Sequence, residues 1–398
     1  MTIKLLLQKV ERLGRALAIR AIVALLPRRQ PGDAEAPRWG ERRHRVLFLR
    51  YDRVGDMIVS TGLMRVIAAS HPTIEVHVVA SRENAPVLDR ELHIANVMVL
   101  DRWKPWTYPA LFRCMRAQRY DAVIDWKIAG PSLTTLLLML ASGARHRIGV
   151  AGCGIESVLT LVVPPAPETL HIVEQLGGLA APFGVDLTTT DWRPRLELSD
   201  EERAAAERIW DEACAGRGGR RFLVNVSAGR PVRYWPPERF VAAIEHVSSR
   251  EPVAAVVVIG APADRERAEQ IARAARALVA RTPGIRSALA LVATADTVLT
   301  SDTSIAHAAS AFARPAVALY SHGEELGWGL YLSPGHSIPS PGREVALLPV
   351  EPVLAALDDL LTRFPPHTGG DRNQHRRSGA DGIRGQAAHG HGRVMIKH

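Results

Sequence analysis

Short runs of β-branched and other apolar residues alternate with helical patterns along most of this 398-residue chain. This alternation is typical of parallel sheets whose strands are joined by crossover helices. Because the chain is longer than one ordinary domain, we expect two such sheets. The expected strands are Val46–Leu49, Glu75–Val79, Val97–Leu100 and Ala122–Ile124 in the first half, and Phe222–Val226, Val253–Ile259, Thr297–Leu299 and Ala316–Leu319 in the second.

A polar stretch that contains a proline, Thr188–Arg195, separates the two halves and is a plausible hinge. Doubly wound sheets bind ligands at the carboxyl ends of their strands, so we expect the site in a cleft between the two domains. The apolar spacing in Val350–Phe364 predicts a closing helix. We therefore divide the chain into an N-terminal helix and linker (1–44), two Rossmann-like domains (45–190 and 191–347), the closing helix (348–366) and a tail (367–398).

The net charge of +9 is concentrated at the two ends of the chain. The first 30 residues contribute +6 and residues 367–398 contribute +4, which leaves the middle at −1. A nearly neutral body argues against nucleic acid as a partner and favours an anionic surface that a terminus meets. Residues 1–30 read as a basic amphipathic helix, which would lie on an anionic membrane or pack on the protein's own surface.

Composition excludes several other classes of protein. Three scattered cysteines (Cys114, Cys153 and Cys214) do not form a disulfide framework or a cysteine-built zinc site, and they fit a reducing compartment. No apolar run approaches the roughly 20 residues that span a bilayer. The tail after residue 366 is rich in Gly, His and Arg, and its composition predicts disorder.

The first strand runs into a loop that contains Gly55 and Asp56 and then into a helix. This arrangement places Asp56 near the carboxyl edge of the first sheet, where Gly55 allows a close approach of backbone and ligand. A carboxylate at that position could accept a proton from a hydroxyl nucleophile. It could equally cap the helix, and the spacing alone does not decide between the two roles.

Two further segments carry the chemistry of an anion site. In the second half, a strand passes into a Ser-Ala-Gly loop that begins at Ser227, followed by Arg230 and Arg233. Small residues let backbone N–H groups face a phosphate, and a guanidinium supplies the opposite charge. The alternative is two solvated arginines in a loop.

The second of these segments begins where a short strand ends at Thr300. There, Asp302, Thr303 and Ser304 lead into a helix that bears His307. Hydroxyl and N–H groups at the start of a helix favour an anion. The alternative is an ordinary helix cap with His307 packed inside.

Several common signatures are missing from the sequence. It has no Walker-type loop and no Asp-x-Asp pair of the kind that often holds a divalent ion, so we expect neither a metal nor a resident cofactor. Gly152-Cys153-Gly154, followed by Ser157, is a broken dinucleotide fingerprint that follows no convincing strand. A Rossmann oxidoreductase is therefore disfavoured.

Four stretches taken together resemble glycosyltransferase family 9, the ADP-heptose:lipopolysaccharide heptosyltransferase family. They occur in family order between about residues 45 and 320, and they read LRYDRVGDMIVSTGLMRVI, VNVSAGRPVRYWPPERF, VVVIGAPADRERAEQIA and VLTSDTSIAHAASAFARPAVALY. The resemblance implies a GT-B fold, with two doubly wound Rossmann-like domains facing across a cleft. It further implies inverting, metal-independent transfer from an ADP-sugar that the C-terminal domain holds.

Within this resemblance, Asp56 matches the family's proposed general base and Arg233 stands where a phosphate-binding lysine is usual. Asp302, Thr303 and His307 match an Asp-Thr/Ser-Gly-x-x-His motif, in which Ser304 replaces the glycine. The implied partners are a nucleotide-sugar donor, a lipid-linked glycan acceptor and an anionic membrane surface, on the cytoplasmic side. A non-catalytic, nucleotide-binding protein of the same shape is the alternative, and retention of both Asp56 and a phosphate-binding cation argues against it.

Overall fold

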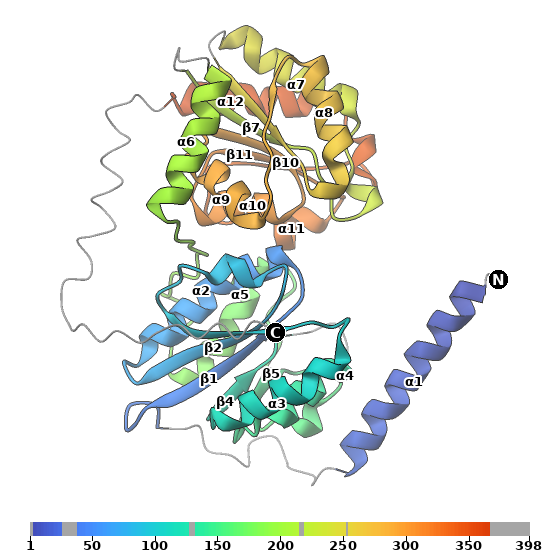
Figure 1. Cartoon of the computed structure of the whole chain (residues 1–398), viewed down its shortest axis with the longest axis vertical. Coiled ribbons are helices and arrows are strands. Elements are labelled where there is room, and N and C mark those ends of the chain that lie inside the picture. The colour runs from blue at the N-terminus through green and yellow to red at the C-terminus, as the bar shows by residue number, and fades with distance from the viewer. Residues whose placement is uncertain (1–2, 26–37, 127–131, 215–218, 252–253, 367–398) are drawn as a thin grey trace. The chain divides into compact units, whose positions relative to one another are not determined.

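The computed structural model describes residues 3–25, 38–126, 132–214, 219–251 and 254–366. In this part of the chain, each of two units is built on a six-stranded parallel sheet (Figure 1). The first unit ends at Trp192 and the second begins at Arg193, two residues after the domain boundary expected from the sequence.

The first sheet has the strand order β3-β2-β1-β4-β5-β6. Helices α2 and α5 cover one face and α3 and α4 the other (Figure 1). With both faces covered, the central strands are apolar on both sides, as the buried run from Val46 to Leu49 shows. The elements are β1 (His44–Arg50), α2 (Val54–Ser70), β2 (Ile74–Ser81), β3 (Ile94–Leu100), α3 (Tyr108–Ala117), β4 (Ala122–Ile124), α4 (Leu133–Ser142), β5 (His146–Val150), β6 (Leu161–Val163) and α5 (Ile172–Gly177).

The second sheet repeats this topology, with the order β12-β11-β10-β7-β8-β9. Helices α7, α8 and α12 pack on one apolar cluster, and α9 packs with α6 and α10. The elements are α6 (Asp200–Cys214), β7 (Arg221–Asn225), α7 (Pro237–Arg250), β8 (Ala255–Ile259), α8 (Arg265–Ala274), β9 (Leu278–Val279), α9 (Ile285–Thr294), β10 (Thr297–Ser301), α10 (Ser304–Ala311), β11 (Ala316–Tyr320), α11 (Glu324–Trp328), β12 (Gly335–Pro339) and α12 (Glu351–Arg363).

All eight expected strands are present, and the structure adds four that the sequence did not predict: β5, β6, β9 and β12. These four strands share a weak apolar signal. Strands β5 (HRIGV) and β12 (GHSIP) are rich in polar residues or glycine, and β6 and β9 hold only three and two residues. Three of them, β6, β9 and β12, lie at sheet edges, where one side of the strand has no partner strand and polar residues are tolerated.

The predicted closing helix is confirmed as α12, which packs on the second sheet. Its last turn is held by Arg220, whose side chain is fully buried. The guanidinium donates to the carbonyl oxygens of Leu361 at 3.0 Å and Phe364 at 2.7 Å. A cation at this position satisfies carbonyl groups that a helix end otherwise leaves without partners.

The expected N-terminal helix is present as α1 (Ile3–Leu25). Its C-terminal part packs on the first unit, because Ile19 is buried and Ile22 and Val23 contact the apolar cluster to which α3 and α4 contribute. Leu13 and Leu17 remain exposed. No helix among the described residues has both the length and the apolar character needed to cross a membrane. The tail predicted to be disordered, 367–398, lies outside the described residues.

The topology fixes where a ligand site can form in each unit. In the first sheet, the chain moves from β1 to β2 and β3 on one side and then returns to add β4 on the other side of β1. The second sheet repeats this with β7 and β10. Such a switch point leaves a crevice beyond the carboxyl ends of the two central strands. Every residue expected to act in catalysis or donor binding follows β1, β7 or β10.

Candidate active site

Asp56 lies in the first turn of α2, directly after the loop that leaves β1. One oxygen of its carboxylate, Oδ2, accepts a hydrogen bond from the backbone N–H of Arg53 at 3.2 Å, so the side chain does cap the helix. The side chain is 17% exposed. The two roles expected from the sequence are therefore compatible, because the cap orients a carboxylate that still reaches solvent.

A buried arginine at the end of β1 organises this loop. The guanidinium of Arg50, whose side chain is 2% exposed, donates to the carbonyl oxygen of Asp56 from Nε at 3.0 Å and from Nη2 at 2.9 Å. Nη1 donates to Oδ2 of Asp52 at 3.0 Å. The ring of Trp126 lies 4.0 Å from the guanidinium carbon. Arg50 thus ties the strand end to the first turn of α2, a role that no motif in the sequence indicated.

The charges around Asp56 act on its proton affinity in opposite directions. Burial raises the pKa of the Asp56 carboxyl above its ordinary value, and the carboxylate of Asp52 adds to this. Arg50, whose Nη2 lies 4.0 Å from Oδ1 of Asp56, lowers the pKa. The net effect is upward, which moves the carboxyl toward the range in which a general base works near neutral pH.

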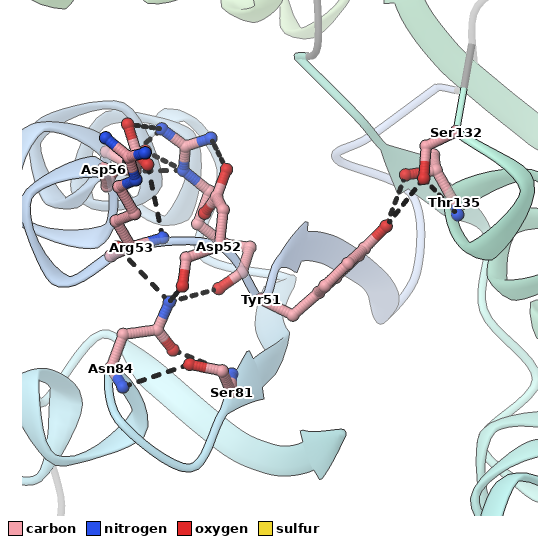
Figure 2. A network of polar contacts seen from close by, with 10 residues as sticks. Tyr51, Asp52, Arg53, Asp56, Ser81, Asn84, Ser132 and Thr135 are labelled. Carbon is pink, nitrogen blue, oxygen red and sulfur yellow. Dashed lines mark hydrogen bonds and ion pairs between the residues drawn. The ribbon is translucent and has the colours of Figure 1, made fainter. Parts of the chain in front are cut away.

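Neighbouring elements hold the same loop in place (Figure 2). The fully buried Asn84 donates from Nδ2 to the carbonyl oxygen of Arg50 at 2.9 Å, and its Oδ1 accepts the N–H of Ser81 at 2.8 Å. On the other side, the hydroxyl of Tyr51 lies 2.7 Å from that of Thr135 in α4. The loop is therefore fastened to the ends of β2 and of α4, and this fixes the position of Asp56.

In the second unit, the ends of β7 and β10 are joined by hydrogen bonds between side chains. Asn225, the last residue of β7, donates to the hydroxyls of Thr300 at 2.9 Å and Thr303 at 3.1 Å. Thr303 caps α10 by accepting the N–H of Ile305 at 3.3 Å. The N-terminus of α10, which begins at Ser304, therefore stands at the switch point of this sheet.

Arg233 reaches this turn from the loop after β7. Its Nη2 lies 2.8 Å from Oδ2 of Asp302, and it also pairs with the carboxylate of Glu324 in α11. Arg230 is half-exposed, and its guanidinium is 4.0 Å from Glu324. The structure thus brings Arg230, Arg233 and Asp302 together, as the sequence predicted. It adds Glu324, which no motif had indicated.

The side chain of Asp302 is 4% exposed. Burial raises its pKa to about 7, against the lowering effect of Arg233 and with a further upward contribution from Glu324. Two carboxyl groups therefore share one guanidinium, and near neutral pH one of them is only partly ionised.

Two other expected residues play supporting parts in the described structure. Ser227 accepts the N–H of Ala261 at 2.6 Å, which joins the loops after β7 and β8. His307 is buried in α10, with its ring centroid 5.9 Å from that of Trp328. The position of His307 agrees with the packed histidine that the sequence analysis kept as an alternative.

The broken dinucleotide fingerprint does follow a strand, contrary to the expectation from the sequence. Gly152 comes shortly after β5, a strand that the sequence did not predict. The N–H groups of Gly152 and Gly154 donate to Oε1 of Glu156 at 2.7 and 3.1 Å, so the chain's own carboxylate occupies this turn. Only a short 3₁₀ turn follows, from Glu156 to Val158, where a dinucleotide site would have a full helix. Among the described residues, no group of three or more His, Cys, Asp or Glu side chains is arranged to hold a metal.

Two doubly wound units, with polar sites at their switch points, define a two-domain α/β enzyme architecture. The model of glycosyltransferase family 9 (heptosyltransferase) matches residues 109–336. The chain belongs to this family and is a glycosyltransferase with the GT-B fold.

Curated relatives and solved structures agree with this assignment. The chain is 25% identical to lipopolysaccharide heptosyltransferase 2 of Escherichia coli K12 over 303 residues, which cover 69% of this chain and 82% of that protein. The structure is similar in fold to a family 9 glycosyltransferase from Veillonella parvula, with TM-score 0.73, 18% identity and coverage of 83% and 99% of the two chains. It also resembles the E. coli ADP-heptose heptosyltransferase II structure, with TM-score 0.65, 22% identity and coverage of 80% and 99%.

The raised pKa of Asp302 predicts how stability depends on pH. Between the ordinary pKa near 4 and the folded value of about 7, the native state binds a proton that the unfolded state releases. The free energy of unfolding therefore falls as pH rises through this window, by on the order of 1 kcal/mol per pH unit. The Asp302→Asn variant has no carboxyl group at this position, so its free energy of unfolding should not fall in this way. The difference in stability between the variant and wild type should therefore shift in favour of the variant from pH 5 to pH 8.

Thermal unfolding of both proteins across this range measures the effect. Glu269→Gln is the matched control, because Glu269 is an exposed carboxylate paired with Arg265, whose hydrogen bond lowers its pKa. The stability difference for this control should stay flat above pH 6. An Asp302→Asn difference that is equally flat would contradict the assignment.

Proposed function

We propose that this glycosyltransferase is an inverting, metal-independent enzyme. It would move a heptose-type sugar from an ADP-linked donor to a lipopolysaccharide or other surface-glycan acceptor. The observation that carries the proposal is the placement of a carboxylate in one unit and a cation in the other, each beyond the carboxyl ends of the central strands of its sheet. Asp56 follows the central strand of the first sheet, and Arg233 with the Asp302–Ser304 turn stands at the switch point of the second. The names of the relatives support the choice of donor and acceptor.

The proposed role of Asp56 is to take the proton of an acceptor hydroxyl as that oxygen attacks the anomeric carbon. The acceptor oxygen forms the new glycosidic bond while the bond to the diphosphate breaks, and the proton moves to the Asp56 carboxylate. Asp56 must be ionised to act, so activity should fall as pH drops through its raised pKa. Arg50 and the Arg53 N–H keep the carboxylate in one orientation.

The proposed donor site stabilises the departing diphosphate. Negative charge grows on the leaving phosphate, and Arg233 together with the N-terminus of α10 would offset it. In the structure, Arg233 is held by Asp302 and Glu324. A proton on Asp302 reduces the negative charge that a phosphate would meet, and the pKa of about 7 makes that proton available near neutral pH. Ser227, Arg230 and His307 complete the proposed donor-binding set, and Gly55 stands on the acceptor side.

We further propose a cytoplasmic enzyme that associates peripherally with the inner face of the membrane. The basic charge at the N-terminus and the exposed Leu13 and Leu17 of α1 support this location. The burial of Ile19 shows that the same helix also packs on the first unit, so the two contacts expected for it would be made by different parts of one helix.

Asp56→Asn tests the base. Replacing the carboxylate should lower turnover by about 10²–10⁴-fold, which is the usual contribution of a general base to the rate, while donor binding changes little. Mass spectrometry would follow transfer from a panel of nucleotide sugars to a lipopolysaccharide-derived acceptor. The matched control is Asp52→Asn, which also removes a carboxylate near Arg50 and should cost less. Near wild-type turnover in Asp56→Asn would exclude the role.

A nucleoside diphosphate tests the donor site. Because ADP binds only the folded protein, a concentration of about 100 times its Kd should raise the melting temperature of this 398-residue chain by roughly 3 °C. EDTA should leave the shift unchanged, and Arg233→Ala should remove most of it. Arg250→Ala, an exposed arginine at the far end of α7, is the control and should retain the full shift. A shift that requires magnesium, or one that Arg233→Ala does not reduce, would count against this site.

A further inference from the structure

Two tryptophans on the first unit are exposed where large apolar side chains are normally buried. Trp103 is 85% exposed and Trp106 is 71% exposed. The chain contains eight tryptophans, all within the described residues, and the other six are buried or half-buried. Large exposed aromatic side chains that lie close together mark an interaction surface.

The segment that carries these rings is well ordered by hydrogen bonds. The carboxylate of Asp101 accepts the N–H of Trp103 at 3.0 Å and lies 3.8 Å from the ammonium group of Lys104. The carbonyl oxygen of Lys104 then accepts the N–H of Thr107 at 2.9 Å. The two indoles are thus presented to solvent by a defined turn, which we call the tryptophan turn (residues 101–107).

The tryptophan turn lies on the same edge of the sheet as Asp56. It leaves the carboxyl end of β3, and the Asp56 loop leaves the carboxyl end of β1. All strands of this sheet are parallel, with only β2 between these two, which places the strand ends about 10 Å apart. A surface that the tryptophans contact would therefore lie beside the acceptor half of the proposed site.

The charge around the tryptophan turn favours an anionic surface. Within the turn itself, Arg102 and Lys104 are basic and Asp101 is the single acidic residue. Arg102 is exposed and precedes Trp103, and Lys104, which stands between the two tryptophans in the sequence, has a side chain that is 45% exposed. Indole rings prefer the boundary between lipid and water, where the ring is apolar and its N–H stays hydrated. Basic residues next to them add attraction to anionic headgroups.

We propose that the tryptophan turn is a membrane anchor that inserts Trp103 and Trp106 into the interface of an anionic bilayer and brings the Asp56 edge to a membrane-borne acceptor. The role of the acceptor rests on the proposed function; the lipid contact itself does not. The site is separate from the basic N-terminal segment, so the protein would meet the membrane at two places on one unit.

Vesicle binding by the full chain tests the anchor. Wild type and the double variant Trp103→Ser/Trp106→Ser would be compared by flotation with vesicles of phosphatidylglycerol and phosphatidylethanolamine, and with phosphatidylcholine vesicles. The matched control is Leu92→Ser, because Leu92 is 96% exposed on the same unit but precedes β3, at the opposite edge of the sheet. We expect the double variant to bind anionic vesicles at least tenfold more weakly and the control to bind as wild type.

Tryptophan fluorescence gives a second, direct readout. Brominated phospholipids quench the fluorescence of indole rings that enter the bilayer. They should therefore quench the tryptophan fluorescence of wild type and of the control, but not that of the double variant. Equal vesicle binding by all three proteins would overturn the anchor, and so would equal losses in the double variant and in Leu92→Ser. The anchor would also be overturned if the double variant bound vesicles as wild type does but transferred sugar more slowly to a lipid-free acceptor. That result would assign the two rings to carbohydrate stacking.

The outcome is independent of the proposed chemistry. If Asp56→Asn keeps full turnover, or ADP gives no thermal shift, while the double variant loses vesicle binding, the anchor stands and the proposed function fails. The ADP-induced shift serves as a control for the donor site, because the tryptophan turn lies in the first unit and the proposed donor residues lie in the second. The double variant should retain that shift in full.

Discussion

The buried guanidinium of Arg50 is the constraint on which the conformation of the Asp56 loop depends. A charged side chain that is only 2% exposed is destabilising unless its N–H groups have hydrogen-bond partners. Arg50 donates to the carbonyl oxygen of Asp56, the carboxylate of Asp52 and the hydroxyl of Ser60. These three partners lie in the loop and in the first and second turns of α2. The requirement to pair one charge therefore fixes the conformation of the whole segment, and with it the direction of the Asp56 side chain.

The second unit has a similar arrangement, in which one guanidinium again lies beside two carboxyl groups. Arg233 pairs with Asp302 and Glu324, and burial raises the pKa of Asp302 to about 7. Both arrangements stand where strand order reverses, because only there do the loops on either side diverge and leave room for a ligand. The shared topology thus places Asp56, a carboxylate with a raised pKa, in one unit, and Arg233, a guanidinium paired with carboxyl groups, in the other.

Much of this architecture could be predicted from the sequence because central parallel strands are buried on both faces and leave long apolar runs. The edge strands β6, β9 and β12 lacked that signal, and so did the polar β5. Asp56, Asp302 and Thr303 were recognisable because they follow predicted strands directly. Arg50 and Glu324 could not be recognised in this way. Arg50 stands at the last position of an apolar strand, and Glu324 is 91 residues from its partner Arg233 in the sequence. Contacts of that kind are set by the fold and carry no local pattern.

The central claim is that burial and Arg50 together set the proton affinity of Asp56. The most direct measurement is the titration of its carboxyl carbon by ¹³C NMR in protein labelled at aspartate, with Asp56→Asn used to assign the resonance. We expect a midpoint above the ordinary value of 3.8, and a further rise in Arg50→Gln, because the opposing positive charge is lost. A midpoint at or below 3.8, or one that does not move when Arg50 is replaced, would contradict it.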